Sequence, residues 1–117
     1  MITIDDVNKF LDEFKVKAKV FGMIFRDDRK KNTETLFALG ISGRVREKIV
    51  FSLEGEDYSQ GPILDTLYEG YDMWVFGKDY NGTELYIKIT IMSGNALCIS
   101  FHEAEHPIVY PFKKEVI

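Results

Sequence analysis

The stretch WVFGKDYNGTELYIKITI, residues 74–91, decides the fold of this 117-residue chain. Asn81-Gly82 separates two runs in which apolar and polar side chains alternate, the pattern of a two-residue type I′ hairpin. With these two residues as the loop, Gly77 pairs with Tyr86 across the hairpin. The stretch therefore predicts two antiparallel strands, with one apolar face that is buried and one polar face that is open.

A third strand follows from the next turn signal, Ser93-Gly94-Asn95. A three-residue loop there pairs Tyr86 with His102, and only this register keeps the apolar side chains of all three strands on one face. The predicted apolar face comprises Trp74, Phe76, Leu85, Ile87, Ile89, Ile91, Leu97, Ile99 and Phe101. The predicted polar face comprises Val75, Gly77, Asp79, Glu84, Tyr86, Lys88, Thr90, Cys98, Ser100 and His102, with Gly77 leaving room beside the polar groups.

Helical patterns precede these strands. Thr3 caps a helix whose apolar stripe runs from Val7 to Phe21 and which ends at Gly22. We expect a short extended segment at 23–25, further helices from about Thr33 to Gly40 and from a Ser42 cap to Gly55, and an acidic loop over 54–72 with one helical turn from Pro62. Together these elements predict a single α+β domain over residues 1–117, with N-terminal helices packed on one face of a C-terminal antiparallel β-meander.

Charge and composition limit the function classes. The net charge of −4 argues against a protein that coats nucleic acid by bulk electrostatics. It is unevenly distributed, because residues 1–50 carry 11 basic and 8 acidic side chains and residues 51–117 carry 4 and 11. A single cysteine, Cys98, excludes an intramolecular disulfide, and the longest apolar-rich stretch, 89–101, is far shorter than the ~20 residues of a membrane span. We expect a cytoplasmic protein.

The predicted polar face brings together Tyr86, Lys88 and His102. A base, a proton donor and a cation are what an RNA 2′-hydroxyl needs to attack its own phosphodiester, so we predict catalytic roles for these three. The alternative is an ordinary amphipathic sheet whose wet face is polar. Cations that we predict to bind RNA phosphates are Arg26, Arg29, Lys30, Lys31 and Lys78, and the alternative for the 26–31 cluster is a solvated loop with internal ion pairs.

Two further features suggest other chemistry. His102-Glu103-Ala104-Glu105-His106 matches the H-E-x-x-H pattern of zinc hydrolases, which requires a helix, whereas our reading places His102 at a strand end and Pro107 disfavours a helix at His106. The alternative is a strand end that leads into a tail, 107–112, whose aromatic side chains pack over the sheet. For Cys98 we expect a packing or surface role rather than a nucleophile.

The chain resembles the MqsR-type toxins of bacterial toxin–antitoxin pairs, within the RelE-like group of mRNA interferases. The resemblance rests on residues 84–91 followed by Ile99-Ser100-Phe101, on residues 39–58 and on Trp74. It implies a RelE-like fold and an endoribonuclease that cleaves mRNA without a metal or other cofactor. It also implies a partner antitoxin with a helix-turn-helix DNA-binding domain.

The resemblance covers the family's functional residues in part. The strand tyrosine of the family falls on Tyr86, and a lysine is replaced by His102. The active-site glutamine falls near Val75 and a second lysine near Ser59, so neither function is retained at those positions. Two alternatives follow, namely a degenerate toxin that acts as a non-catalytic protein-interaction module, and a small zinc hydrolase using His102 and His106.

Overall fold

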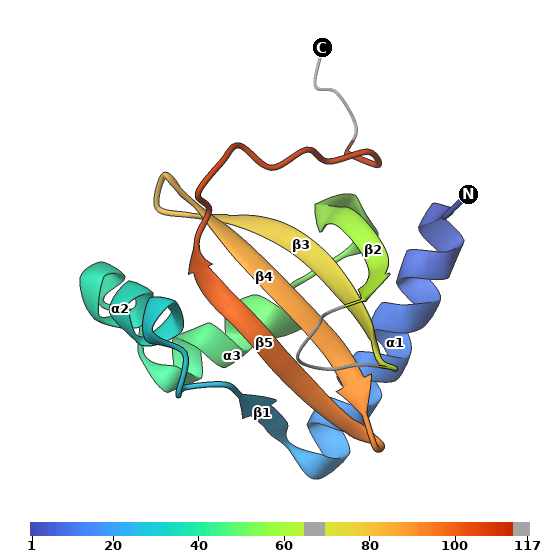
Figure 1. The fold of residues 1–117 in the computed structure, drawn as a ribbon, viewed down its shortest axis with the longest axis horizontal. Coiled ribbons are helices and arrows are strands. Elements are labelled where there is room, and N and C mark those ends of the chain that lie inside the picture. The colour runs from blue at the N-terminus through green and yellow to red at the C-terminus, as the bar shows by residue number, and fades with distance from the viewer. Residues whose placement is uncertain (65–69, 114–117) are drawn as a thin grey trace.

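The computed structural model describes residues 1–64 and 70–113, and it has the predicted α+β architecture (Figure 1). One five-stranded sheet has the order β1-β5-β4-β3-β2. The strands are β1 Met23–Phe25, β2 Tyr58–Leu64, β3 Asp72–Tyr80, β4 Thr83–Met92 and β5 Asn95–Glu103. The helices are α1 Ile4–Phe21, α2 Lys30–Leu39 and α3 Gly43–Phe51, with a short 3₁₀ turn at Gly55–Asp57.

The main core lies between one face of the sheet and the helices behind it. In Figure 1, α1 and α3 lie behind the sheet, whereas α2 lies beside the part of β5 that β1 does not pair with. The face toward the viewer therefore carries no helix, and we call it the open face. The core combines α1, the end of α3 and the rear of the strands, and its fully buried members include Val7, Phe14, Val50, Leu53, Phe76, Leu85, Ile87, Ile89 and Phe101.

The first hairpin has the predicted register. Gly77 pairs with Tyr86, and the ladder extends from Trp74↔Ile89 to Tyr80↔Thr83. Asn81 and Gly82 both have positive φ, at 50° and 90°, as a type I′ turn requires. The alternation of residues 74–91 was therefore sufficient to determine this part of the sheet.

The second hairpin follows the predicted register only in the half that is far from its turn. Tyr86↔His102 and Lys88↔Ser100 are as predicted, but the register shifts by one residue between Lys88 and Ile89. A β-bulge at this point makes Ile99 the extra residue, so the loop has two residues rather than three. In consequence Cys98 faces the helices, whereas Leu97 and Ile99 lie with Met73 in a second apolar cluster.

Two other strand predictions need correction. The extended segment 23–25 is β1, and because it pairs in parallel with β5 the sheet is not purely antiparallel. The expected helical turn from Pro62 is part of β2, which pairs with β3. Residues 65–69 of the expected acidic loop lie outside the described residues. Gly61-Pro62 within β2 is a turn signal, which is why the sequence did not indicate a strand here.

The helix predictions are accurate in kind and less so in length. Thr3 caps α1 with a capping box, in which Asp6 N donates to Thr3 Oγ1 at 3.2 Å. The second helix begins at Lys30 rather than Thr33, and the third ends at Phe51 rather than Gly55. Phe21 is 68% exposed, because α1 projects past the sheet at this end. No helix in the described part of the chain has the length and apolarity to span a membrane.

Candidate functional site

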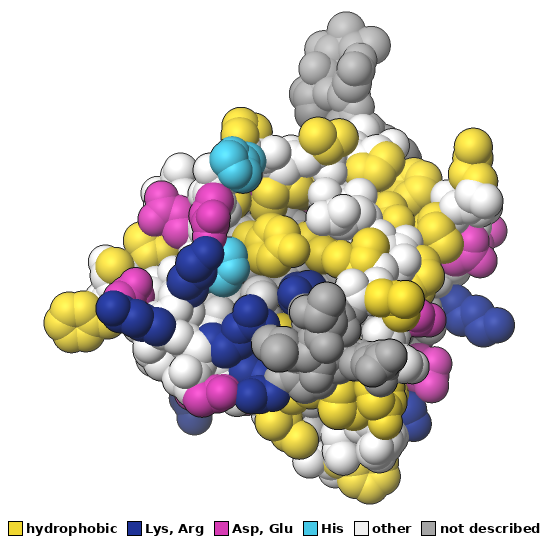
Figure 2. Space-filling model, viewed as in Figure 1, with side chains coloured by type: hydrophobic (Ala, Val, Ile, Leu, Met, Phe, Trp, Pro, Cys, Tyr) yellow, Lys and Arg dark blue, Asp and Glu magenta, His cyan; other side chains and the backbone are white. Residues whose placement is uncertain are grey.

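The open face holds a pocket of about 620 Å³ at the end of the sheet where β5 leaves it. Figure 2 shows this face, on which both histidines and a group of Lys and Arg side chains lie beside a hydrophobic area. The pocket is formed by β2, β3, β4, β5, the start of α2 and the chain after β5. Its lining residues are Arg29, Ser59, Gln60, Val75, Tyr86, Lys88, Ser100, His102, Glu105, His106, Pro107, Ile108 and Val109.

All three residues that we predicted to be catalytic line this pocket. The imidazole of His102 is stacked on the Tyr86 ring, with 5.2 Å between centroids and 15° between planes. His102 Nδ1 lies 2.9 Å from the carbonyl oxygen of Glu103. Because a carbonyl only accepts hydrogen bonds, Nδ1 carries the proton in this contact. In the neutral ring Nε2 is therefore the nitrogen that can accept a proton.

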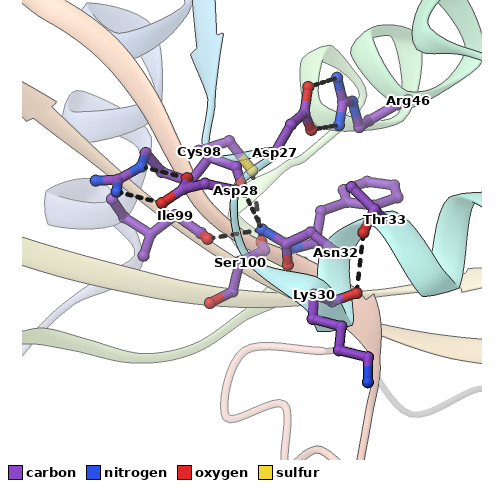
Figure 3. Close-up of polar contacts among 11 residues, drawn as sticks. Asp27, Asp28, Lys30, Asn32, Thr33, Arg46, Cys98, Ile99 and Ser100 are labelled. Carbon is purple, nitrogen blue, oxygen red and sulfur yellow. Dashed lines mark hydrogen bonds and ion pairs between the residues drawn. The ribbon is translucent and has the colours of Figure 1, made fainter.

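The β-bulge in β5 is stabilised by one side chain of α2, Asn32, which is 3% exposed (Figure 3). Its Nδ2 donates to the carbonyls of Ile99 (2.9 Å) and Arg26 (3.0 Å). Its Oδ1 accepts from Phe101 N at 2.9 Å. The Asn32 amide thus continues the strand pairing where β1 ends, and it fixes the start of α2 beside Ser100 and the pocket.

A second contact anchors the loop before α2. Asp27 pairs with Arg46 of α3 at 2.5 and 3.3 Å (Figure 3), and the Arg46 guanidinium lies 3.7 Å from the centre of the Phe25 ring. Since Arg46 is 8% exposed, this ion pair is shielded from solvent on the arginine side. The loop that carries Arg29 is therefore held by α3 on one side and by Asn32 on the other.

Arg29 is the residue at the N-terminus of α2 that reaches the pocket. Its Nη1 is buried and has no hydrogen-bond partner among residues 1–64 and 70–113. Leaving a buried guanidinium N–H without an acceptor is costly, so this atom is suited to an oxygen of an anionic ligand. Lys88 lines the same pocket from β4.

The other predicted RNA-binding cations lie outside the pocket and pair with carboxylates. Arg26 donates to Asp28 at 2.9 and 2.8 Å, which raises the pKa of Arg26 and lowers that of Asp28. Lys30 lies 3.6 Å from Glu34, and Lys78 lies 3.0 Å from Asp57. Of these three cations none lines the pocket.

Lys31 is connected to the pocket indirectly. It pairs with Glu105, a lining residue, and its hydrogen bond is the main cause of the lowered pKa of the Glu105 carboxyl. Glu105 is thus ionised and its charge is offset by a lysine outside the pocket. Of the ion pairs predicted within the 26–31 loop, Arg26–Asp28 is present, whereas Asp27 pairs with Arg46 of α3 outside it.

The chain after β5 forms one wall of the pocket. Glu84 accepts hydrogen bonds from Ile108 N at 2.9 Å and from the Tyr110 hydroxyl at 2.8 Å. We expected Gly77 to leave open room, but Tyr110 fills it, and a Cβ atom at Gly77 would collide with that hydroxyl. Phe112 stacks on Tyr58 with centroids 5.4 Å apart, so the aromatic tail packs over the sheet as predicted.

Sequence reasoning missed the contribution of β2. Ser59 and Gln60 line the pocket, and Gln60 pairs with Val75 of β3 between two register shifts. Such bulges re-aim side chains next to functional sites. Glycines and Pro62 make this segment resemble a loop in the sequence, which carries no signal that would place Gln60 here.

The remaining candidates have no catalytic geometry. Cys98 is buried against the helices, and burial raises its pKa to about 12, so the thiol is a packing residue. The H-E-x-x-H segment lacks the helix that the zinc motif needs, because His102 lies in β5 and His106 in the bend that follows. Within the described ranges, no three His, Cys, Asp or Glu side chains are grouped so that they could hold a metal ion.

Comparison with models of known protein families, with curated proteins and with solved structures finds no match for this chain. The pocket itself is therefore the basis for proposing a function. Its distinctive content is a stacked Tyr–His pair, a second histidine, a lysine and an arginine with an unpaired buried nitrogen, on a protein with a net charge of −4.

Proposed function

We propose that this protein is an endoribonuclease that cleaves RNA without a metal ion, with the open-face pocket as its active site. The observation that carries the proposal is the placement of Arg29 in the same pocket as Lys88 and the stacked Tyr86–His102 pair. A phosphodiester needs cationic donors for its oxygens and a proton acceptor for its 2′-hydroxyl. The pocket offers both within about 620 Å³.

The roles follow from the geometry of each side chain. Nε2 of His102 takes the proton of the 2′-hydroxyl as the 2′-oxygen attacks phosphorus, and Tyr86 is its partner, since stacking on Tyr86 holds the imidazole ring. Arg29 and Lys88 bind the phosphate oxygens, on which negative charge builds in the transition state. The bond from phosphorus to the 5′-oxygen then breaks, and that oxygen must receive a proton.

The resemblance to MqsR-type toxins gains support from Gln60. The family glutamine falls near Val75 in this sequence, and Gln60 is the residue that pairs with Val75 from the neighbouring strand. A carboxamide is therefore available in the pocket from β2 although β3 carries a valine. We accordingly propose a toxin of a toxin–antitoxin pair, acting on cytoplasmic mRNA and inhibited by an antitoxin protein.

Cleavage of a mixed RNA by the purified protein in the presence of EDTA tests the catalytic proposal. We expect cleavage by the wild type and a loss of about 10²–10⁴-fold in His102→Ala, the range for removing a general base. Arg29→Ala should lose activity, whereas Arg44→Ala, which removes an exposed arginine outside the pocket, should not. Equal rates in wild type and His102→Ala would contradict the proposal.

The toxin role has its own test. Expression of the wild-type chain in bacteria should arrest growth, expression of His102→Ala should not, and co-expression of the product of the adjacent reading frame should restore growth. An inactive wild type that binds the adjacent product without arresting growth would instead support the non-catalytic interaction module.

A further inference from the structure

The second histidine of the pocket has no role in the mechanism above. The chain contains two histidines, and both His102 and His106 line the same pocket of about 620 Å³. They come from different backbone contexts, since His102 belongs to β5 and His106 to the bend after it. The two imidazoles therefore line one pocket from β5 and from the segment that follows it.

The segment that carries His106 is held on both sides. The preceding residue, Glu105, pairs with Lys31 of α2. Two residues later, Ile108 N donates to Glu84 at 2.9 Å, and Tyr110 donates to the same carboxylate at 2.8 Å. An exposed side chain on a free tail would occupy many positions, whereas these anchors confine His106 to the rim of the pocket.

The chemistry of RNA cleavage requires a second proton carrier. The 2′-oxygen gives its proton to a base, and the 5′-oxygen must gain one as its bond to phosphorus breaks. Tyr86 stacks on His102, and a tyrosine phenol is in general a much weaker acid than an imidazolium. An imidazolium is a better donor, because imidazole changes charge between about pH 5 and 8.

We propose that His106 is the general acid of this site, and that it protonates the leaving 5′-oxygen; the inference rests on the proposed ribonuclease function. In the full step the 2′-oxygen–phosphorus bond forms and the phosphorus–5′-oxygen bond breaks. One proton passes to Nε2 of His102 and one leaves the His106 imidazolium. The products are a 2′,3′-cyclic phosphate and a 5′-hydroxyl, and solvent returns both imidazoles to their starting states.

The charged and titratable groups around His106 come from four elements. Arg29 lines the pocket from the start of α2, Lys88 and Tyr86 from β4, His102 from β5, and Glu105 from its own segment. Protonation of His106 adds charge to a pocket that already holds Arg29 and Lys88, and a bound phosphate offsets that charge. The donor should therefore act when substrate is present.

A change of leaving group tests this assignment. A nucleoside 3′-(4-nitrophenyl phosphate) releases nitrophenolate, which needs no proton, whereas RNA releases an alkoxide that does. We expect His106→Ala to lose about 10²–10³-fold on RNA, in the range for general-acid catalysis, and to retain close to the wild-type rate on the nitrophenyl ester. His102→Ala should lose activity on both substrates. Arg44→Ala, which removes an exposed side chain outside the pocket, should be active on both.

The pH–rate profile gives an independent readout. The wild type should show a bell-shaped profile on RNA, and His106→Ala should lose the limb that falls at high pH. Equal losses of His106→Ala on both substrates, or no loss on either, would overturn the general-acid role while the ribonuclease function stands. A wild type that cleaves neither substrate would overturn both proposals.

Discussion

The two faces of the β4–β5 pair share one backbone, but one face is packed in the core and the other lines the pocket. Toward the helices, Ile87, Ile89 and Phe101 are no more than 1% exposed and belong to the main core. On the open face, the alternate residues Tyr86, Lys88 and His102 are half-buried and line the pocket. Core residues and residues of the proposed active site therefore alternate along the strand, so that substitutions at neighbouring positions should have different consequences.

The adjacent residues Phe101 and His102 offer the largest contrast. Phe101→Ala removes a fully buried ring and should lower the free energy of unfolding by about 3–5 kcal/mol. His102→Ala removes a half-buried side chain and should cost less than about 1 kcal/mol of stability while lowering the cleavage rate by about 10²–10⁴-fold. Urea denaturation of both variants measures this contrast, and similar losses of stability would show that the open face also supports the fold.

Asn32 is hydrogen-bonded to the backbone of β5 at its bulge, and its removal should have an intermediate effect on stability. Asn32→Ala leaves the Ile99 carbonyl and the Phe101 N–H buried without their partner, which should cost about 3 kcal/mol. Thr33→Ala, which removes an exposed hydroxyl bonded to the Lys30 carbonyl, is the matched control and should cost under about 1 kcal/mol. Urea denaturation measures both, and equal effects of the two substitutions would argue against a special role for the Asn32 amide.

Tyr110 should give the smallest effect, and one that depends on pH. Burial and the hydrogen bond to Glu84 raise the pKa of its phenol. The folded protein therefore favours the protonated phenol, and this contribution is fully present below about pH 10 and is lost as the pH rises through the raised pKa. Tyr110→Phe should be about 1 kcal/mol less stable than the wild type at pH 8, and the difference should shrink toward pH 11.

Denaturation midpoints of the two proteins across this pH range measure the Tyr110 effect, and the comparison cancels the titration of the other tyrosines. A difference that stays constant from pH 8 to 11 would show that folding does not raise the pKa of the Tyr110 phenol.

The accuracy of the sequence predictions follows the regularity of the backbone. The Asn81-Gly82 turn and strict alternation fix one register, and they place Tyr86 opposite His102. The apolar–polar alternation of the sequence continues past Ile99, but the bulge there reverses which face each residue lies on. Cys98 therefore faces the helices and Leu97 the other side, opposite to the prediction. The site was predictable where it lies on regular strands, which accounts for Tyr86, Lys88 and His102.

Long-range contacts decide the rest of the site. Five cations were candidate RNA-binding residues in the sequence, with no feature to rank them. In the tertiary structure Arg29 is the one among these five that lines the pocket. Arg26 and Lys30 pair with carboxylates nearby in sequence, Asp28 and Glu34, whereas Lys78 pairs with the distant Asp57. Gln60 and the wall after β5 enter the pocket through a bulged strand and through the Glu84 hydrogen bonds, neither of which has a local pattern.

By itself, then, the sequence determined the α+β class, the first hairpin and the pairing of Tyr86 with His102, because hydrophobic periodicity and turn chemistry are local properties. The tertiary structure was needed to show which cation lines the pocket, where β5 bulges and that the chain after β5 forms a wall of the pocket. Those features depend on single hydrogen bonds and ion pairs between distant segments, such as Asn32 with β5, Lys31 with Glu105 and Glu84 with the tail.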